Sequence, residues 1–154
     1  MRILIDTNIL LRLSELTHFH HAAAVESLRR LAGARHTFCI GSQTVSEFLA
    51  VATRSTADNG LGMDQATADR ELGKLTEALE ILFDSPAVLD ELRRLVVAHS
   101  VVGKSVHDAK LVATMNVSGV KDILTFNRQD FIRFPQINVL DPSAVQNAPQ
   151  PPAG

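Results

Sequence analysis

Short apolar runs alternate along this chain with longer stretches in which apolar residues recur every three or four positions. The runs Arg2–Ile5, Thr37–Ile40, Ile123–Phe126 and Ile137–Leu140 are typical of β-strands. Helical periodicity fills most of the sequence between them. This alternation predicts an α/β domain with a central, mostly parallel β-sheet flanked by helices.

The segments with helical periodicity are punctuated by residues that favour helix ends. Leu72, Leu75, Leu79 and Leu82 share one helical stripe, although Ile81–Phe83 also fits a short strand. The segments predicted as helices are Thr7–Leu13, His20–Ala32, the one opened by Gly41–Ser42, Asp64–Leu82, Ser85–His99 and the one that carries Asp108 after Gly103.

Length and composition indicate one globular domain. The chain has 154 residues, of which 45% are hydrophobic and 21% charged. The stretch from Pro142 is rich in Pro, Gln and Ala, so we predict a domain over residues 1–142 and a disordered tail over residues 143–154. The single Cys39 lies in an apolar run, and the first apolar stretch is too short to cross a membrane. We therefore expect a cytoplasmic protein.

The charge balance limits how the chain could meet nucleic acid. A net charge of −2 argues against binding through overall charge, so any contact needs a local basic patch. The absence of Trp and Tyr disfavours a base-stacking platform of the kind found in single-strand-binding proteins.

Four carboxylates stand where predicted strands end or predicted helices begin. Asp6 ends the first strand, Glu47 and Asp108 lie in the first turns of two helices, and Asp130 follows a later strand. Residues at such junctions can converge on one pocket, where their mutual repulsion is costly unless a cation offsets it. Oxygen ligands suit hard divalent ions, so the pattern favours Mg²⁺ or Mn²⁺.

Each carboxylate could also serve only as a helix cap. Thr44-x-x-Glu47 and Ser105-x-x-Asp108 fit the capping-box pattern, while Asp6 and Asp130 could cap the turns that follow them. The helix around Asp108 is apolar nearly all round, which predicts that this carboxylate is partly buried and needs a partner. Glu47 lies off the apolar stripe of its helix, and periodicity leaves open whether it faces a groove or solvent.

Other catalytic chemistries fit the sequence less well. The stretch Val102–Ser105 carries only the end of a phosphate-binding loop, without its leading glycine. The six histidines are scattered, with neither an HExxH pattern nor a cysteine pair, so a zinc site is disfavoured.

The sequence resembles the PIN domains, a family of metal-dependent ribonucleases that includes the VapC toxins of bacterial toxin–antitoxin pairs. The resemblance rests on ILIDTNILL, QTVSEFLAVATR, GKSVHDAKLVATM and ILTFNRQDFIRFP, which occur in the family's order and cover about Met1 to Pro142. It implies a Mg²⁺- or Mn²⁺-dependent endoribonuclease that hydrolyses phosphodiester bonds of RNA. The site residues that it implies are Asp6, Glu47, Asp108 and Asp130 as metal ligands, with Thr7 or Asn8, Thr125 and Asn127 as polar helpers.

We expect basic side chains near these residues to hold the RNA backbone. The candidates are Lys110, Arg128, Arg12, Lys104 and Arg133. Lys110 and Arg128 are favoured because each lies two residues from a proposed site residue, although solvated surface charge is the alternative for every one of them.

The resemblance also implies partners: a second copy of the chain in a homodimer, and a cognate antitoxin over the active-site groove. Apolar surface on the predicted helices 20–32 and 64–82 would support such association. Three alternatives stay open: an interaction module that no longer cleaves, a nuclease without an antitoxin, and a structural domain with four helix caps.

Overall fold

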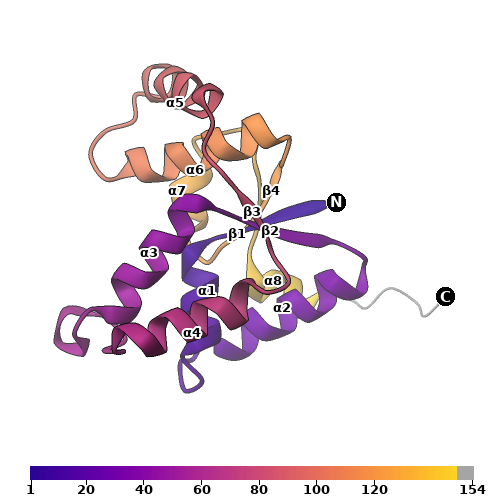
Figure 1. Ribbon diagram of the computed structural model, residues 1–154. Helices are drawn as coiled ribbons and strands as arrows, with labels where there is room; N and C mark the ends of the chain where they lie inside the picture. The colour runs from indigo at the N-terminus through magenta and orange to yellow at the C-terminus, as the bar shows by residue number, and fades with distance from the viewer. Residues whose placement is uncertain (149–154) are drawn as a thin grey trace.

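The computed structural model describes residues 1–148 and places five strands in one fully parallel sheet (Figure 1). This arrangement confirms the predicted α/β class. The strands are β1 (Arg2–Ile5), β2 (Thr37–Gly41), β3 (Glu80–Leu82), β4 (Asp122–Leu124) and β5 (Asn138–Leu140), in the spatial order β3-β2-β1-β4-β5.

Helices cover both faces of the sheet (Figure 1), and none within residues 1–148 is long and apolar enough to cross a membrane. A short 3₁₀ turn over Thr56–Asp58 joins the third and fourth helices. The α-helices are α1 (Thr7–Ser14), α2 (His21–Gly33), α3 (Ser42–Thr53), α4 (Gln65–Thr76), α5 (Pro86–Ala98), α6 (Ser105–Ser118), α7 (Arg128–Phe131) and α8 (Pro142–Asn147).

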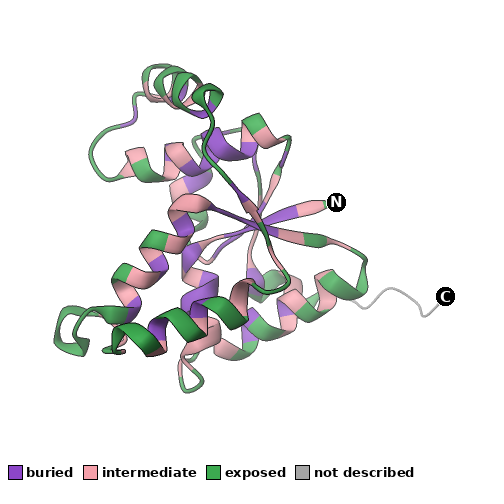
Figure 2. Ribbon diagram, viewed as in Figure 1, coloured by how far each residue is buried: buried purple, intermediate pink, exposed green. Residues whose placement is uncertain are grey.

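Alternating side chains of β1 separate two hydrophobic cores. Leu4 packs with residues of α5, α6 and α7, whereas Ile3 and Ile5 pack with residues of α1, α2, α3 and α4. All three side chains are buried, and Figure 2 shows buried residues along the strands and on the sheet-facing sides of the helices. A strand that is apolar on both faces therefore lies at the centre of the sheet, as expected for β1 in a parallel arrangement.

The chain changes direction across the sheet at β1. Strands β2 and β3 lie on one side of β1, and β4 and β5 lie on the other. Open α/β sheets bind ligands beyond the carboxyl ends of the strands at such a switch point. Asp6 follows β1 directly and Thr125 follows β4 directly, so both residues lie at this switch point.

The predicted helix over Asp64–Leu82 is wrong in its second part. Helix α4 ends at Thr76, and the chain then enters β3. Ile81 and Leu82 pair with Ile40 and Gly41 of β2. Sheet pairing thus outweighs the helical spacing of the leucines, and the alternative of a short strand is the correct one, shifted by one residue.

Part of the tail that was predicted to be disordered is helical. Residues 143–147 belong to α8, which begins at Pro142 and packs against α2. Asp141 stabilises the start of α8, because its Oδ1 accepts a hydrogen bond of 2.8 Å from the Ser143 N–H. The remaining part of the predicted tail, residues 149–154, lies outside the described residues.

Removing the cap of α8 should measure how much this helix contributes. We predict that Asp141→Ala lowers the free energy of unfolding by about 0.5–2 kcal/mol, since a helix N-cap is lost. Urea unfolding would test this, with Ser143→Ala as the control because the Ser143 side chain is exposed. Equal stability of the Asp141→Ala variant and the unmodified protein would contradict a folded α8.

Candidate active site

Asp6 is fixed by three hydrogen bonds at the carboxyl edge of the sheet. Its Oδ1 accepts from the Thr7 N–H at 2.7 Å, which makes Asp6 the N-cap of α1. Its Oδ2 accepts from Asn8 Nδ2 at 2.7 Å and from Thr125 Oγ1 at 2.6 Å. Asp6 therefore caps α1, as one alternative predicted. Its second oxygen, Oδ2, instead bonds to Thr125 at the end of β4.

The Thr125 hydroxyl is buried and its orientation is determined by its neighbours. Its oxygen accepts from Asn8 Nδ2 and from the Asn127 N–H, both at 3.0 Å. Because these two groups can only donate, the proton of the hydroxyl is left to point at Asp6. Asn8 also accepts from the Phe126 N–H at 3.2 Å. Asn127 thus contributes through its backbone, while its side chain is exposed.

Glu47 is half-buried and points toward α1, which answers the orientation that its periodicity left open. Thr7 Oγ1 donates to Glu47 Oε2 at 2.6 Å, and Gln43 Nε2 donates to Glu47 Oε1. Gln43 Nε2 also donates to the backbone carbonyl of His107 at 3.1 Å, so it joins α3 to α6. The sequence analysis did not identify Gln43. Its spacing of four residues from Glu47 on one helix was the available signal.

Asp108 and Asp130 complete the acidic group from α6 and α7, and both are half-buried. Desolvation raises the pKa of Asp108 to about 6, and the negative charges of Asp130 and Glu47 add to that rise. The positive charges of His107 and Arg133 act in the opposite direction and lower the pKa of Asp108. The pKa of Asp108 therefore depends on carboxylates of two other helices, α3 and α7.

Burial and nearby negative charges also act on the pKa of Asp6. Burial raises the pKa of Asp6 to about 6, against the lowering effect of its hydrogen bonds from Thr125 and Thr7. The charges of Glu47 and Asp108 raise this pKa further. The fold thus brings Asp6, Glu47 and Asp108 within electrostatic reach of one another, and Asp130 within reach of Asp108.

Capping does not explain three of these carboxylates. The N-cap positions of α3, α6 and α7 are Gly41, Lys104 and Asn127, and none of them receives a side-chain capping bond. Neither predicted capping box is formed. Among the four acidic residues, only Asp6 carries a capping bond within residues 1–148.

The donor set fits a hydrated hard cation. Within residues 1–148, no three His, Cys, Asp or Glu side chains are arranged to hold a metal ion directly. Mg²⁺ usually binds through one or two carboxylates and keeps several waters, so it does not need such a set. Beside Glu47, the buried Gln43 Oε1 has no hydrogen-bond partner among the described residues, and a water ligand of a cation could donate to it.

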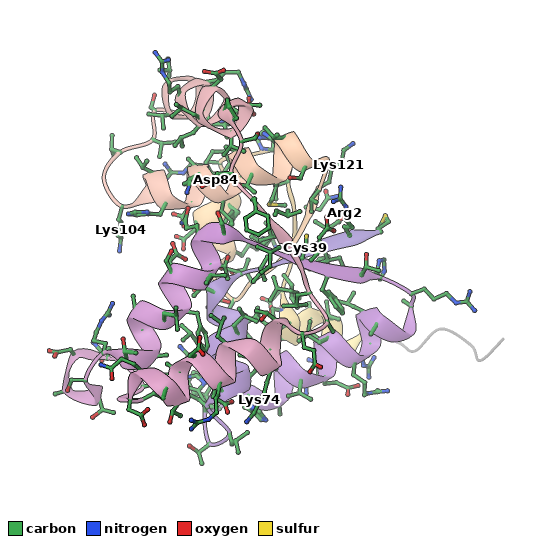
Figure 3. All side chains as sticks on the ribbon, viewed as in Figure 1. Arg2, Cys39, Lys74, Asp84, Lys104 and Lys121 are labelled. Carbon is green, nitrogen blue, oxygen red and sulfur yellow. The ribbon has the colours of Figure 1, made fainter. Side chains whose placement is uncertain are left out.

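The basic side chains predicted to hold the RNA backbone differ in whether they already form ion pairs. Lys110 pairs with Asp84 at 2.8 Å, and Arg12 pairs with Glu15, so their charges are already partly neutralised. Lys104 and Arg128 are exposed and form no ion pair within residues 1–148. Figure 3 labels Lys104 at the start of α6, and Asp84, the partner of Lys110. Arg128 also lines a hollow of about 580 Å³ with Asn127 and Asp130.

The raised pKa values predict how stability depends on pH. An acid with a raised pKa binds protons more tightly in the folded state, so metal-free protein should lose stability as pH rises from about 4 to about 6. In EDTA at pH 7, Asp108→Asn should therefore be more stable than the unmodified protein, by about 1 kcal/mol after screening by solvent.

Urea unfolding in EDTA across this pH range would measure the effect. The advantage of Asp108→Asn should shrink toward pH 4, where the aspartate it replaces is protonated. Asp90→Asn is the control, since Asp90 is exposed on α5 and is not one of the carboxylates of the site. Destabilisation of Asp108→Asn at pH 7 would instead assign Asp108 a capping role.

The family and structural comparisons agree with the fold. The PIN domain family matches residues 3–137. No curated protein matches the chain. The fold is similar to VapBC2 from Rickettsia felis bound to a DNA fragment from its promoter, with 17% identity, a TM-score of 0.71, and coverage of 92% of this chain and 98% of that chain.

Two further solved structures share the fold. VapBC-1 from nontypeable Haemophilus influenzae is 15% identical, with a TM-score of 0.70 and coverage of 93% of this chain and 99% of that one. VapC20 from Mycobacterium tuberculosis, described as a sarcin-ricin loop cleaving toxin, is 15% identical, with a TM-score of 0.58 and coverage of 79% and 86%. Since the family match extends over most of the sequence, the chain belongs to the PIN domain family.

Proposed function

We propose that the chain is a Mg²⁺- or Mn²⁺-dependent endoribonuclease, and that it acts as the toxin of a toxin–antitoxin pair. The observation that carries the proposal is the position of Asp6, which the 2.6 Å bond from Thr125 fixes at the switch point of the sheet beside two further carboxylates. Membership of the PIN family supports nuclease chemistry. The similarity to a structure named as a sarcin-ricin loop cleaving toxin supports RNA as the substrate class.

We assign roles to the acidic residues by what fixes each of them. Asp6 and Asp108 are the principal metal ligands, and Glu47 and Asp130 complete the site directly or through water. A bound cation would supply a water of lowered pKa and would offset the charge that develops on the scissile phosphate. Thr7 and Gln43 orient Glu47, so that its lone pairs remain directed into the pocket.

The polar residues after β4 act as positioning residues. The Thr125 hydroxyl holds Asp6 Oδ2, and the Asn127 N–H holds the Thr125 oxygen. Arg128 and Lys104 are the best candidates to bind the RNA backbone, because they are exposed and form no ion pair within residues 1–148. Lys110 and Arg12 would first have to leave their carboxylate partners.

A non-catalytic interaction module is the second candidate. The absence of a ready-made group of three metal ligands within residues 1–148 is the observation that favours it. Both candidates predict a folded acidic pocket, so only a cleavage assay separates them.

A homodimer and a cognate antitoxin are part of the proposal. Similar solved structures are VapBC complexes and the FitAB complex bound to DNA, which supports an antitoxin partner. The predicted apolar surface lies elsewhere than expected. No large apolar residue of the region 64–82 is exposed, and only Val25 of α2 is, whereas Leu89 and Val97 of α5 are exposed. The apolar residues of α4 are instead covered by α3.

Cleavage should require both the cation and the acidic residues. With Mg²⁺ or Mn²⁺ the protein should cut RNA, and EDTA should stop the reaction. Asp6→Asn and Asp108→Asn should each lower kcat by about 10²–10³, since each removes a carboxylate that would hold the cation at the reacting phosphate. Gel analysis of RNA fragments would measure this, with Asp90→Asn as the control. Full activity of either site variant would refute the assignment.

Thr125 offers a subtler test, because its hydroxyl acts through Asp6. Thr125→Val should weaken Mn²⁺ binding and lower kcat by about tenfold, the value of one hydrogen bond to a charged group. Thr125→Ser retains the hydroxyl and should restore both quantities. Calorimetric titration with Mn²⁺ alongside the cleavage assay would check this. Equal loss in the Ser and Val variants would indicate a packing role instead.

Association is testable without a substrate. Sedimentation at micromolar concentration should show a homodimer, and Val97→Asp should weaken it if the exposed apolar face of α5 is buried between copies. A monomer would refute the dimer. Co-expression with an antitoxin should give an inactive complex, and a partner that binds without suppressing cleavage would rule out occlusion of the site.

A further inference from the structure

Four aromatic rings lie in successive contact between the loop after α1 and the end of β4. His18 and Phe19 are stacked, with ring centroids 4.5 Å apart and an interplanar angle of 24°. Phe19 and His20 lie 4.0 Å apart and are tilted by 43°, and His20 and Phe126 lie 4.2 Å apart and are tilted by 50°. We name these four residues the aromatic ladder. It connects the loop between α1 and α2 to the segment that follows Thr125.

The inner end of the ladder belongs to the acidic site. The N–H of Phe126 donates to Asn8 Oδ1 at 3.2 Å, and Asn8 in turn donates to Asp6. Phe126 also lines the hollow of about 580 Å³ that contains Arg128 and Asp130. A chain that occupies this hollow would therefore lie against Phe126, the inner ring of the ladder, and against Asp130.

The ladder is open to solvent at its second ring, Phe19. Phe19 is 82% exposed, so its ring contributes little to the hydrophobic core. Ring faces held in a stack offer a flat apolar surface, which suits a planar partner better than an aliphatic one. Nucleobases are planar and stack on aromatic side chains irrespective of their sequence.

The charges around the ladder suit a nucleotide. Partial burial lowers the pKa of His18, as do the positive charges of Arg12 and His20, against the opposite effect of Glu15. The lowered pKa favours the neutral imidazole, and a neutral ring can stack without desolvating a charge. The guanidinium of Arg12 lies close enough to influence His18 and could contact a phosphate once released from Glu15.

We propose that His18, Phe19, His20 and Phe126 form a subsite that holds an unpaired nucleobase of the RNA substrate beside the acidic residues. The inference rests on the proposed ribonuclease function and narrows its substrate to RNA with an unstacked nucleotide next to the cleaved bond. The absence of Trp and Tyr disfavoured a stacking platform at the level of sequence. Here Phe and His supply the same ring faces from two separate segments.

The absence of tryptophan allows a direct test. Phe19→Trp would introduce the only tryptophan of the chain, and a stacked nucleobase quenches indole fluorescence. The probe is an unstructured single-stranded RNA of about ten nucleotides, titrated in EDTA so that it is not cleaved. We expect saturable quenching of Phe19→Trp. Leu16→Trp is the matched control, since Leu16 is 76% exposed in the same loop and lies outside the ladder.

Affinity provides the second measurement. Phe19→Ala should weaken binding of the same RNA by about five- to hundredfold, the range for loss of one base-stacking contact. Phe19→Leu keeps an apolar side chain without a ring face and should lose nearly as much, whereas Leu16→Ala should bind like the unmodified protein. Because Phe19 and Leu16 are both exposed, these variants should fold, and circular dichroism would verify this.

The outcomes separate this inference from the proposed function. Absence of quenching in Phe19→Trp, equal quenching in Leu16→Trp, or unchanged affinity of Phe19→Ala would overturn the nucleobase subsite while leaving RNA cleavage untouched. Loss of antitoxin binding by Phe19→Ala with unchanged RNA affinity would also overturn it and would assign the ladder to a protein partner. Quenching by RNA in a protein that never cleaves would support the subsite and contradict the nuclease.

Discussion

The hydrogen bond from Thr125 to Asp6 is the interaction on which the site depends. It joins the residues that follow β1 and β4, the two strands between which the order of the sheet changes direction. The register of these strands, with Ile5 opposite Leu124, places the next residues side by side without any special loop. A central apolar strand and a parallel neighbour thus deliver a carboxylate and its hydrogen-bond donor to the same point of the sheet edge.

Electrostatic repulsion explains why the rest of the pocket is organised as it is. Asp6 and Asp108 both have pKa values raised to about 6, which means that the folded protein bears a cost when they are ionised at neutral pH. Hydrogen bonds from the Thr125 hydroxyl and the Thr7 N–H limit this cost at Asp6 but add no positive charge there. A divalent cation would offset this repulsion, so the same close approach of carboxylates that destabilises the metal-free protein would strengthen binding of the ion.

The sequence predicts the architecture well because its signals are local. The apolar runs of β1 and β2, the Asp6 cap of α1 and the proline that begins α5 each lie within a few residues. Prediction from sequence fails where contacts between residues distant in the chain determine the local structure. The end of α4 depends on the pairing of Ile81 with Ile40, and the order of residues 143–147 depends on packing against α2.

The same distinction holds for the site. The position of Asp6 and Asp108 at element junctions could be predicted, because a junction is visible in the sequence. The salt bridge of Lys110 with Asp84 and the stack between His20 and Phe126 could not, because each joins segments separated in the chain. Side-chain partners of that kind follow only from the fold.

Binding of a divalent cation to the carboxylate cluster is the central claim, and its linkage to stability tests that claim most directly. Thermal unfolding at pH 7 should be followed while Mn²⁺ is titrated into the unmodified protein and into the Asp6→Asn/Asp108→Asn double variant. The account predicts that the midpoint of the unmodified protein rises with Mn²⁺ concentration, since ligand binding to the folded state alone adds RT ln(1 + [L]/Kd) to its stability. The double variant should show no such rise. A response of equal size in both proteins, or none in the unmodified protein, would contradict a metal site built from these carboxylates.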